Sequence, residues 1–177
     1  AKAKQEACGV AKPIVVYLSP QGKRADQELI NQLAQETGVI FVCGRYEGVD
    51  ERFIQRNVDV ELSVGDFVVS GGELPALLIM DAVVRQIPGA MNSQESVECD
   101  SFMDGLLDCP HYTVPRDYQD AKVPEVLFSG NHEQIRKWRL QQSLWRTYQR
   151  RPELLQTRKL TKEESRLLSE MLAKSQD

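Results

Sequence analysis

The chain has 177 residues, of which 41% are hydrophobic and 27% are charged, and its formal net charge is −4. These values are typical of a globular protein with its own core, and they exclude a collagen-like or disordered chain. No apolar run approaches the ~18–20 residues of a membrane-spanning helix, so we expect no membrane partner.

Predicted strands and helices alternate in the first half of the chain. Apolar or β-branched runs predict strands at residues 13–18, 39–43, 58–62 and 67–70. Apolar residues at helical spacing predict helices at residues 25–36, 50–57 and 73–86. Because strands that are apolar throughout are buried on both faces, we expect an α/β fold with a mainly parallel sheet covered by helices.

Ligands of such sheets bind at the loops beyond the carboxyl ends of the strands. Here these loops are residues 19–22, which we expect to form a turn, 44–48 and 63–72. Their glycines permit close approach of the backbone to a ligand, although tight turns alone would also explain them. The chain lacks the GxGxxG and GxxxxGK[ST] phosphate-binding motifs and the GxSxG hydrolase motif.

The composition changes after Pro88 and Gly89. We expect a flexible linker at residues 92–99 between an α/β domain (residues 1–91) and a helical domain (residues 100–177). In the second domain, helical spacing predicts a helix at residues 131–149, and Thr161 with Glu164 forms a capping-box pattern before a last amphipathic helix.

Charge is distributed unevenly over the second half. Residues 92–130 carry eight acidic and two basic side chains, whereas residues 131–151 carry six basic and one acidic. A basic helix is more often a solvated surface than a nucleic-acid site, so this feature alone leaves both interpretations open. The four cysteines form no CxxC pair, which is typical of a reduced, cytoplasmic protein without structural zinc.

Six motifs, in order along nearly the whole chain, resemble the bacterial TrmD-type tRNA (guanine-N1)-methyltransferase family. They are YLSPQG (17–22), CGRYEGVDER (43–52), SVGDFVVSGGELP (63–75), DSF (100–102), GLLDCPHY (105–112) and SGNH (129–132).

This resemblance implies a SPOUT fold, in which the parallel sheet contains a deep trefoil knot that binds S-adenosylmethionine. The implied cofactor-binding residues are Tyr17, Leu18, Ser19, Pro20, Gly44, Tyr46, Glu47, Gly48, Val64, Gly65, Asp66, Phe67, Val68, Val69, Gly71, Gly72 and Pro75.

The implied reaction methylates N1 of guanine 37, the base 3′ to the anticodon of tRNA. The resemblance assigns the general base to Asp100 and the stabilisation of charge on guanine O6 to Arg85, and it implies that Mg²⁺ assists, with unknown ligands. Candidates for tRNA binding are Asp108, His111, Asn131, Arg136, Lys137, Arg139, Arg146 and Arg150, together with Arg151.

The resemblance also implies a homodimer whose active site is shared between subunits. Family members begin with a further strand, helix and glycine-rich loop, so we expect Ala1 to start a fragment or an incompletely ordered chain. A protein made only of these residues should be poorly stable or inactive beside a longer one, and equal behaviour of the two would contradict this expectation.

Two alternative functions remain open. A SPOUT methyltransferase acting on a ribose 2′-hydroxyl would not need the Asp100 carboxylate, and a non-catalytic RNA-binding module would not bind S-adenosylmethionine.

Overall fold

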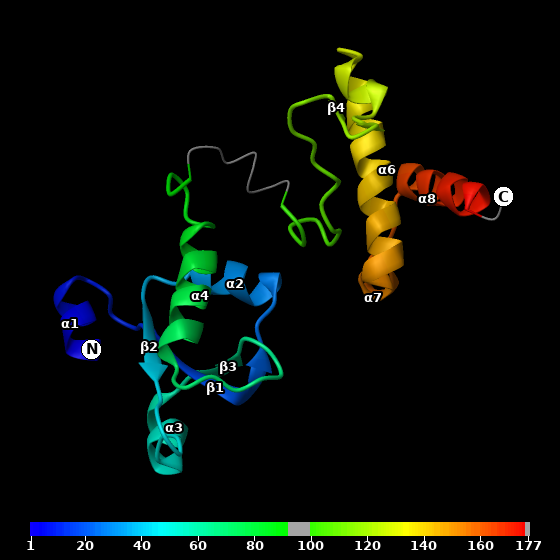
Figure 1. Ribbon diagram of the computed structural model, residues 1–177. Coiled ribbons are helices and arrows are strands. Elements are labelled where there is room, and N and C mark those ends of the chain that lie inside the picture. Colours follow the sequence, from blue (N-terminus) through cyan, green and yellow to red (C-terminus); the bar gives the residue numbers. More distant parts are fainter. Residues whose placement is uncertain (92–99, 176–177) are drawn as a thin grey trace. The chain divides into compact units, whose positions relative to one another are not determined.

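The computed structural model describes residues 1–91 and 100–175 (Figure 1). The chain divides into two compact units, residues 1–97 and 98–177, and each is described by itself. The linker predicted at residues 92–99 lies outside the described residues.

The first unit is built on a three-stranded parallel sheet. β1 (Ile14–Arg24) is the central strand, and it pairs in parallel with β2 (Val39–Cys43) on one side and β3 (Val60–Ser63) on the other. The helices of this unit are α1 (Lys2–Ala7), α2 (Gln27–Ala34), α3 (Glu51–Asn57) and α4 (Glu73–Val84). The predicted parallel α/β sheet is therefore confirmed, while the trefoil knot stays a prediction.

The core of this unit lies between the sheet and two helices. α2 begins where the Asp26 carboxylate accepts a hydrogen bond from Leu29 N at 2.9 Å, which satisfies one of the free N–H groups of its first turn. α2 packs beside α4 (Figure 1). The buried residues of this core are Val16, Leu18, Leu29, Ile30, Leu33, Leu62, Ala76, Ile79 and Val83.

Two predicted details are wrong. The turn expected at residues 19–22 lies inside β1, because Leu18 and Lys23 are both in register with Leu62 and the residues between them form a bulge. The strand expected at residues 67–70 is a loop with exposed side chains. Its β-branched residues find no neighbouring strand to pair with in the described sheet, so the intrinsic preference has no effect.

The second unit is mainly helical. A segment without regular structure, residues 100–116, leads to a short hairpin and a 3₁₀ turn. The elements that follow are β4 (Asp117–Tyr118), β5 (Ala121–Lys122), η1 (Glu125–Phe128), α6 (His132–Arg150), α7 (Pro152–Thr157) and α8 (Lys162–Lys174).

α6 packs against α8 around a small leucine core (Figure 1). Leu106, Leu144 and Leu167 are buried at its centre. The predicted capping box of α8 is present, because Thr161 Oγ1 accepts from Glu164 N while the Glu164 carboxylate accepts from Thr161 N. Among the residues that the structure describes, none of the helices is long and apolar enough to cross a membrane.

Candidate functional site

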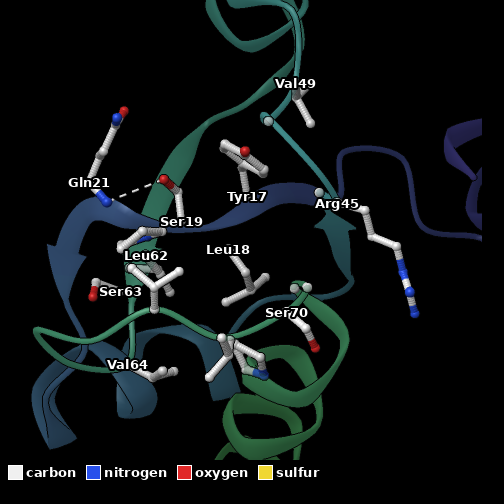
Figure 2. Close-up of a pocket in the computed structure, with 18 of the residues that line it drawn as sticks. Tyr17, Leu18, Ser19, Gln21, Arg45, Val49, Leu62, Ser63, Val64 and Ser70 are labelled. Atoms are coloured by element: carbon white, nitrogen blue, oxygen red, sulfur yellow. Dashed lines mark hydrogen bonds between the residues drawn. The ribbon is translucent and has the colours of Figure 1, made fainter.

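The loops associated with the three parallel strands meet around one hollow of about 270 Å³. Residues 17–21 come from β1, residues 44–49 follow β2, and residues 64–65 and 67–72 follow β3. Figure 2 shows side chains from all three segments around it, with Tyr17 and Val49 on one side and Leu62, Ser63 and Val64 on another. The hollow therefore lies where parallel sheets place their ligands, at the carboxyl edge.

Backbone hydrogen bonds join the loops that form this hollow. Gly72 N donates to Gly44 O at 3.0 Å, and Arg45 forms an isolated antiparallel bridge with Gly71. The buried Ser63 hydroxyl donates to Gly65 O at 2.9 Å and accepts from Gly65 N at 3.1 Å, which closes the turn after β3. These contacts preorganise the walls of the hollow in the absence of a ligand.

Glycine at position 72 is required by the closeness of two backbones. A methyl group added there would lie 2.8 Å from Cys43 Cα and 3.2 Å from Gly44 N. At Gly44, an added methyl group would meet the Tyr17 hydroxyl at 3.0 Å. The wall can thus present peptide groups, rather than long side chains, to whatever binds.

The rim of the hollow has little charge. Arg45 Nε donates to Glu73 Oε1 at 2.7 Å, and this hydrogen bond is the main cause that lowers the pKa of Glu73. Other charged lining residues are Glu47 and Glu51. Tyr46 is fully exposed beside them, with φ of +57°. A backbone-rich, weakly charged wall fits a polar heterocycle and a sugar better than a polyphosphate.

The structure brings all of the predicted cofactor-binding residues except Asp66 to this hollow. Asp66 is exposed and does not line it. Several further residues line the hollow that were not among the predicted cofactor-binding residues. Six of them lie within the quoted motifs, which were the signal that could have found them: Gln21, Arg45, Val49, Glu51, Ser63 and Ser70. Ile54 and Leu62 lie outside those motifs.

The two predicted catalytic residues lie in different units. Arg85 is the half-buried C-cap of α4, and its backbone N–H donates to Asp81 O at 3.1 Å. Asp100 is exposed at the start of the described part of the second unit, where its carbonyl accepts from Met103 N at 3.3 Å.

Residues 100–109 form a closed loop in the second unit. Ser101 Oγ accepts a hydrogen bond from Asp108 N at 2.9 Å, so the two ends of the loop are joined. Phe102 N donates to Leu106 O at 2.7 Å within it, and Leu106 is buried in the leucine core. The loop thereby holds the backbone beside Asp100 next to that of Asp108.

Asp108 is ionised and hydrogen-bonded. Burial raises its pKa, but hydrogen bonds with His111 Nε2, 2.6 Å away, and from Cys109 N outweigh burial, so the pKa lies below its ordinary value. Burial raises the pKa of the Cys109 thiol, which keeps it protonated at neutral pH.

Asp108, Cys109 and His111 are the one group among residues 1–91 and 100–175 whose ligand atoms lie close enough together to hold a metal ion. One carboxylate with a thiol and an imidazole does not suit Mg²⁺, which prefers an octahedron of oxygen ligands.

A second hollow, of about 450 Å³, lies in the second unit. Its wall includes His111 and Arg139, and the Arg116 guanidinium lies 4.0 Å from the centre of the Phe128 ring. Cationic and aromatic side chains together suit an unstacked RNA base with its phosphate.

The basic helix α6 is partly neutralised by its own acidic neighbours. Arg136 pairs with Glu133 at 2.9 Å and with Glu163 at 2.7 Å, and Lys137 Nζ lies 3.3 Å from Glu133. The hydrogen bonds from Arg136 and Lys137 lower the pKa of Glu133 to about 2.

The other candidates of this region differ in their surroundings. Within the described second unit, Arg139, Arg146 and Arg150 form no ion pair, whereas Arg151 pairs with Glu153. The Asn131 side chain caps α6 by accepting from Gln134 N at 3.1 Å, so its amide already has a structural role.

Comparison with known proteins gives one consistent result. The sequence pattern of the family described as "tRNA (Guanine-1)-methyltransferase TrmD" matches residues 1–157. A relative from Chromobacterium violaceum, named tRNA (guanine-N(1)-)-methyltransferase, is 61% identical over 96% of this chain and 67% of its own length. A relative of the same name from Pseudomonas syringae pv. tomato is 56% identical over 99% of this chain and 70% of its own length. Another, from Pseudomonas aeruginosa, is 56% identical over 98% of this chain and 69% of its own length.

Proposed function

The chain belongs to the TrmD family of tRNA (guanine-1)-methyltransferases, and we propose that it transfers a methyl group from S-adenosylmethionine to N1 of guanine 37 in tRNA. The observation that carries the proposal is the hollow at the carboxyl edge of the sheet. Its walls come from three loops, two of which are joined by a backbone hydrogen bond, and glycine at position 72 lets these two backbones approach closely.

This hollow fits the cofactor by its chemistry. Peptide N–H and C=O groups can read the edge of an adenine, and the Glu47 carboxylate on the rim can accept hydrogen bonds from ribose hydroxyls. When bound, S-adenosylmethionine supplies a methyl group on a positively charged sulfur. Tyr17 and Val49 close one side of the hollow and would exclude water there.

The substrate nitrogen must lose its proton as it is methylated. Guanine N1 is protonated at neutral pH, so a base is needed, and negative charge develops toward O6. We assign the base to Asp100 and the stabilisation of O6 to Arg85. Guanine N1 is a weak acid, so Arg85 must raise the acidity of N1 by stabilising the charge on O6, and positioning must contribute the rest.

Among the described residues, no group of side chains suits Mg²⁺. The described donors that lie together are those of Asp108, Cys109 and His111, and they do not match its preferred ligands.

The second unit is proposed to bind tRNA. Because tRNA is the substrate, we also propose that the enzyme acts in the cytoplasm. Arg139, Arg146 and Arg150 are the α6 cations not engaged with described carboxylates, so they are the stronger candidates for phosphate contacts. Asp108 and His111 would contact the target guanine. Arg136 and Lys137 would contribute less, because binding would have to compete with their existing ion pairs.

A homodimer is proposed from the surface of α4. This helix is apolar on all sides, yet Leu74, Leu77, Leu78 and Met80 are 66%, 59%, 60% and 43% exposed. A helix that is hydrophobic all round is normally buried, and exposed apolar patches mark interfaces. We propose that a second copy covers this face and that each active site takes Arg85 from one subunit and Asp100 from the other.

The reaction is tested by replacing the base while keeping its shape. Asp100→Asn should lower the turnover of methyl transfer at least ~100-fold while the Kd for S-adenosylmethionine stays unchanged, because the cofactor hollow is intact. Asp120→Asn, an exposed carboxylate in the β4–β5 turn, is the matched control and should keep full turnover. Full turnover of Asp100→Asn would refute the assignment.

Product analysis separates the alternatives. Transcripts with guanine or adenine at position 37 are digested to nucleosides, and the methylated position is determined by mass spectrometry. Methyl on N1 of guanine alone is expected. Methyl on a ribose would indicate a 2′-O-methyltransferase, and absence of S-adenosylmethionine binding would leave an RNA-binding module.

The shared site has its own test. Mixing Arg85→Ala with Asp100→Ala subunits should restore activity in the heterodimers, since one of the two sites then carries both native residues. Subunit exchange is verified first. If the exchanged mixture then shows no restored activity, a site built from two subunits is refuted.

A further inference from the structure

An ion pair between a half-buried arginine and a buried glutamate holds the loop that carries Asp100 and Asp108. Arg158 and Glu164 have side chains that are only 20% and 6% exposed, and Arg158 Nη2 donates to Glu164 Oε1. Arg158 Nη1 donates to the carbonyl oxygen of Asp104, in the middle of the loop, and lies 3.7 Å from the Asp104 carboxylate. One guanidinium therefore bridges the last helix and the 100–109 loop.

The position of Glu164 is itself determined by the start of α8. Its second carboxylate oxygen, Oε2, accepts from Thr161 N at 2.7 Å in the capping box. Because both oxygens are engaged, the carboxylate has one orientation, and Arg158 is held in one place by it.

The rest of the loop is tied to α6. Leu107 N donates to the Thr147 hydroxyl at 2.9 Å, and Thr147 is completely buried. Gly105 lies between these anchors with φ of +82°, a backbone conformation that residues with side chains rarely adopt. Thus the loop has one anchor on α6 and another on the Arg158–Glu164 pair.

We propose that Arg158 and Glu164 are positioning residues for methyl transfer, an inference that rests on the proposed function. They hold the 100–109 loop so that Asp100 and Asp108 meet the target guanine at the required place. Both lie beyond residue 157, where the match to the family pattern ends, and neither belongs to the motifs that carry the resemblance. They act through the loop and contact no substrate.

The test must separate positioning from stability. Arg158→Met leaves the buried Glu164 carboxylate without its cation, so it should lower both the Tm and kcat. In Arg158→Met/Glu164→Gln the buried charge is gone and the glutamine oxygen can still accept from Thr161 N. The double variant should therefore recover much of the Tm but not kcat.

Kinetics are measured in the intact protein, well below the Tm of every variant. We expect kcat of the double variant to fall roughly 10- to 100-fold with the Kd for S-adenosylmethionine unchanged, because misplaced catalytic groups slow the chemical step. Arg158→Lys keeps a cation and should restore part of kcat. The matched control is Arg166→Met, which removes an exposed arginine of α8 that pairs with Glu170, and it should change neither kcat nor Tm.

Amide hydrogen exchange gives a readout that does not depend on activity. In the double variant, the amides of Leu107 and Asp108 should exchange faster than in the native protein. In the Arg166→Met control, the same two amides should exchange at the native rate. Unchanged exchange, or a kcat that recovers together with the Tm, would overturn the positioning role. If the native protein itself transfers no methyl group, the proposed function fails, and the exchange data still decide whether the pair holds the loop.

Discussion

Replacement of Gly72 by alanine tests whether close backbone contact forms the cofactor hollow. The added methyl group would lie 2.8 Å from Cys43 Cα, whereas ordinary contacts of this kind are 3.4–4 Å. The neighbouring atom belongs to the backbone of β2, so it cannot rotate away as the end of a side chain can. The loops at residues 44–48 and 70–72 must therefore separate by about 0.6 Å or more.

The magnitude follows from this displacement. Overpacking of a well-packed site costs about 1–3 kcal/mol. If the loops open to relieve the strain, ligand binding must close them again, so the Kd for S-adenosylmethionine should rise about 5- to 150-fold. Isothermal titration calorimetry measures this Kd, and denaturant unfolding measures any part of the cost that remains as lost free energy of unfolding.

Gly38→Ala is the matched control. A methyl group there would meet the side-chain atoms Gln5 Oε1 at 2.6 Å and Val10 Cγ1 at 2.7 Å, and Gly38 does not line the hollow. It should leave the Kd unchanged even where it lowers stability. If Gly72→Ala binds the cofactor within twofold of the native protein, the geometric reasoning is refuted.

Three further predictions concern the second unit and the cysteines. His111→Ala should raise the pKa of Asp108, because burial still raises this pKa while one hydrogen bond that lowers it is lost; the ¹³C shift of the carboxyl group, followed against pH, measures the change. In the native protein, ionised Asp108 contributes stability that is fully present above its unfolded pKa. This contribution should disappear as the pH falls through the lower pKa of the folded state. Leu144→Ala should lower the free energy of unfolding by about 2–5 kcal/mol, because Leu144 is completely buried, and an unchanged denaturation midpoint would contradict this. Iodoacetamide at neutral pH should modify the exposed Cys8 well before Cys109, whose thiol is buried with a raised pKa; peptide mass spectrometry over time would reveal the opposite order if the reasoning is wrong.

Helix ends and apolar strands were predictable from sequence because their causes are local. The capping box of Thr161 and Glu164 involves residues three positions apart, and the run at residues 39–43 needs only its own apolar side chains to indicate a strand. The expected burial of that strand on both faces is wrong, because β2 is at the edge of the described sheet, where its residues are half-buried or exposed. The grouping of the three loops followed from the general rule that parallel strands end at one edge.

The strand predicted at residues 67–70 failed for the opposite reason. Its composition favours a strand, but a strand exists only where another one offers free N–H and C=O groups. Likewise, the turn at residues 19–22 is absorbed into β1 because Leu62 lies in register with residues on both sides of it.

The sequence by itself therefore determined the parallel α/β unit, the capping box of α8, the family and the three loops that surround the hollow. Only the tertiary structure decided that Gly72 must be glycine and that Arg158 bridges Glu164 and the loop of Asp104. Short-range preferences can be read along the chain, whereas contacts such as the one between residues 104 and 158 depend on which distant segments the folded core brings together.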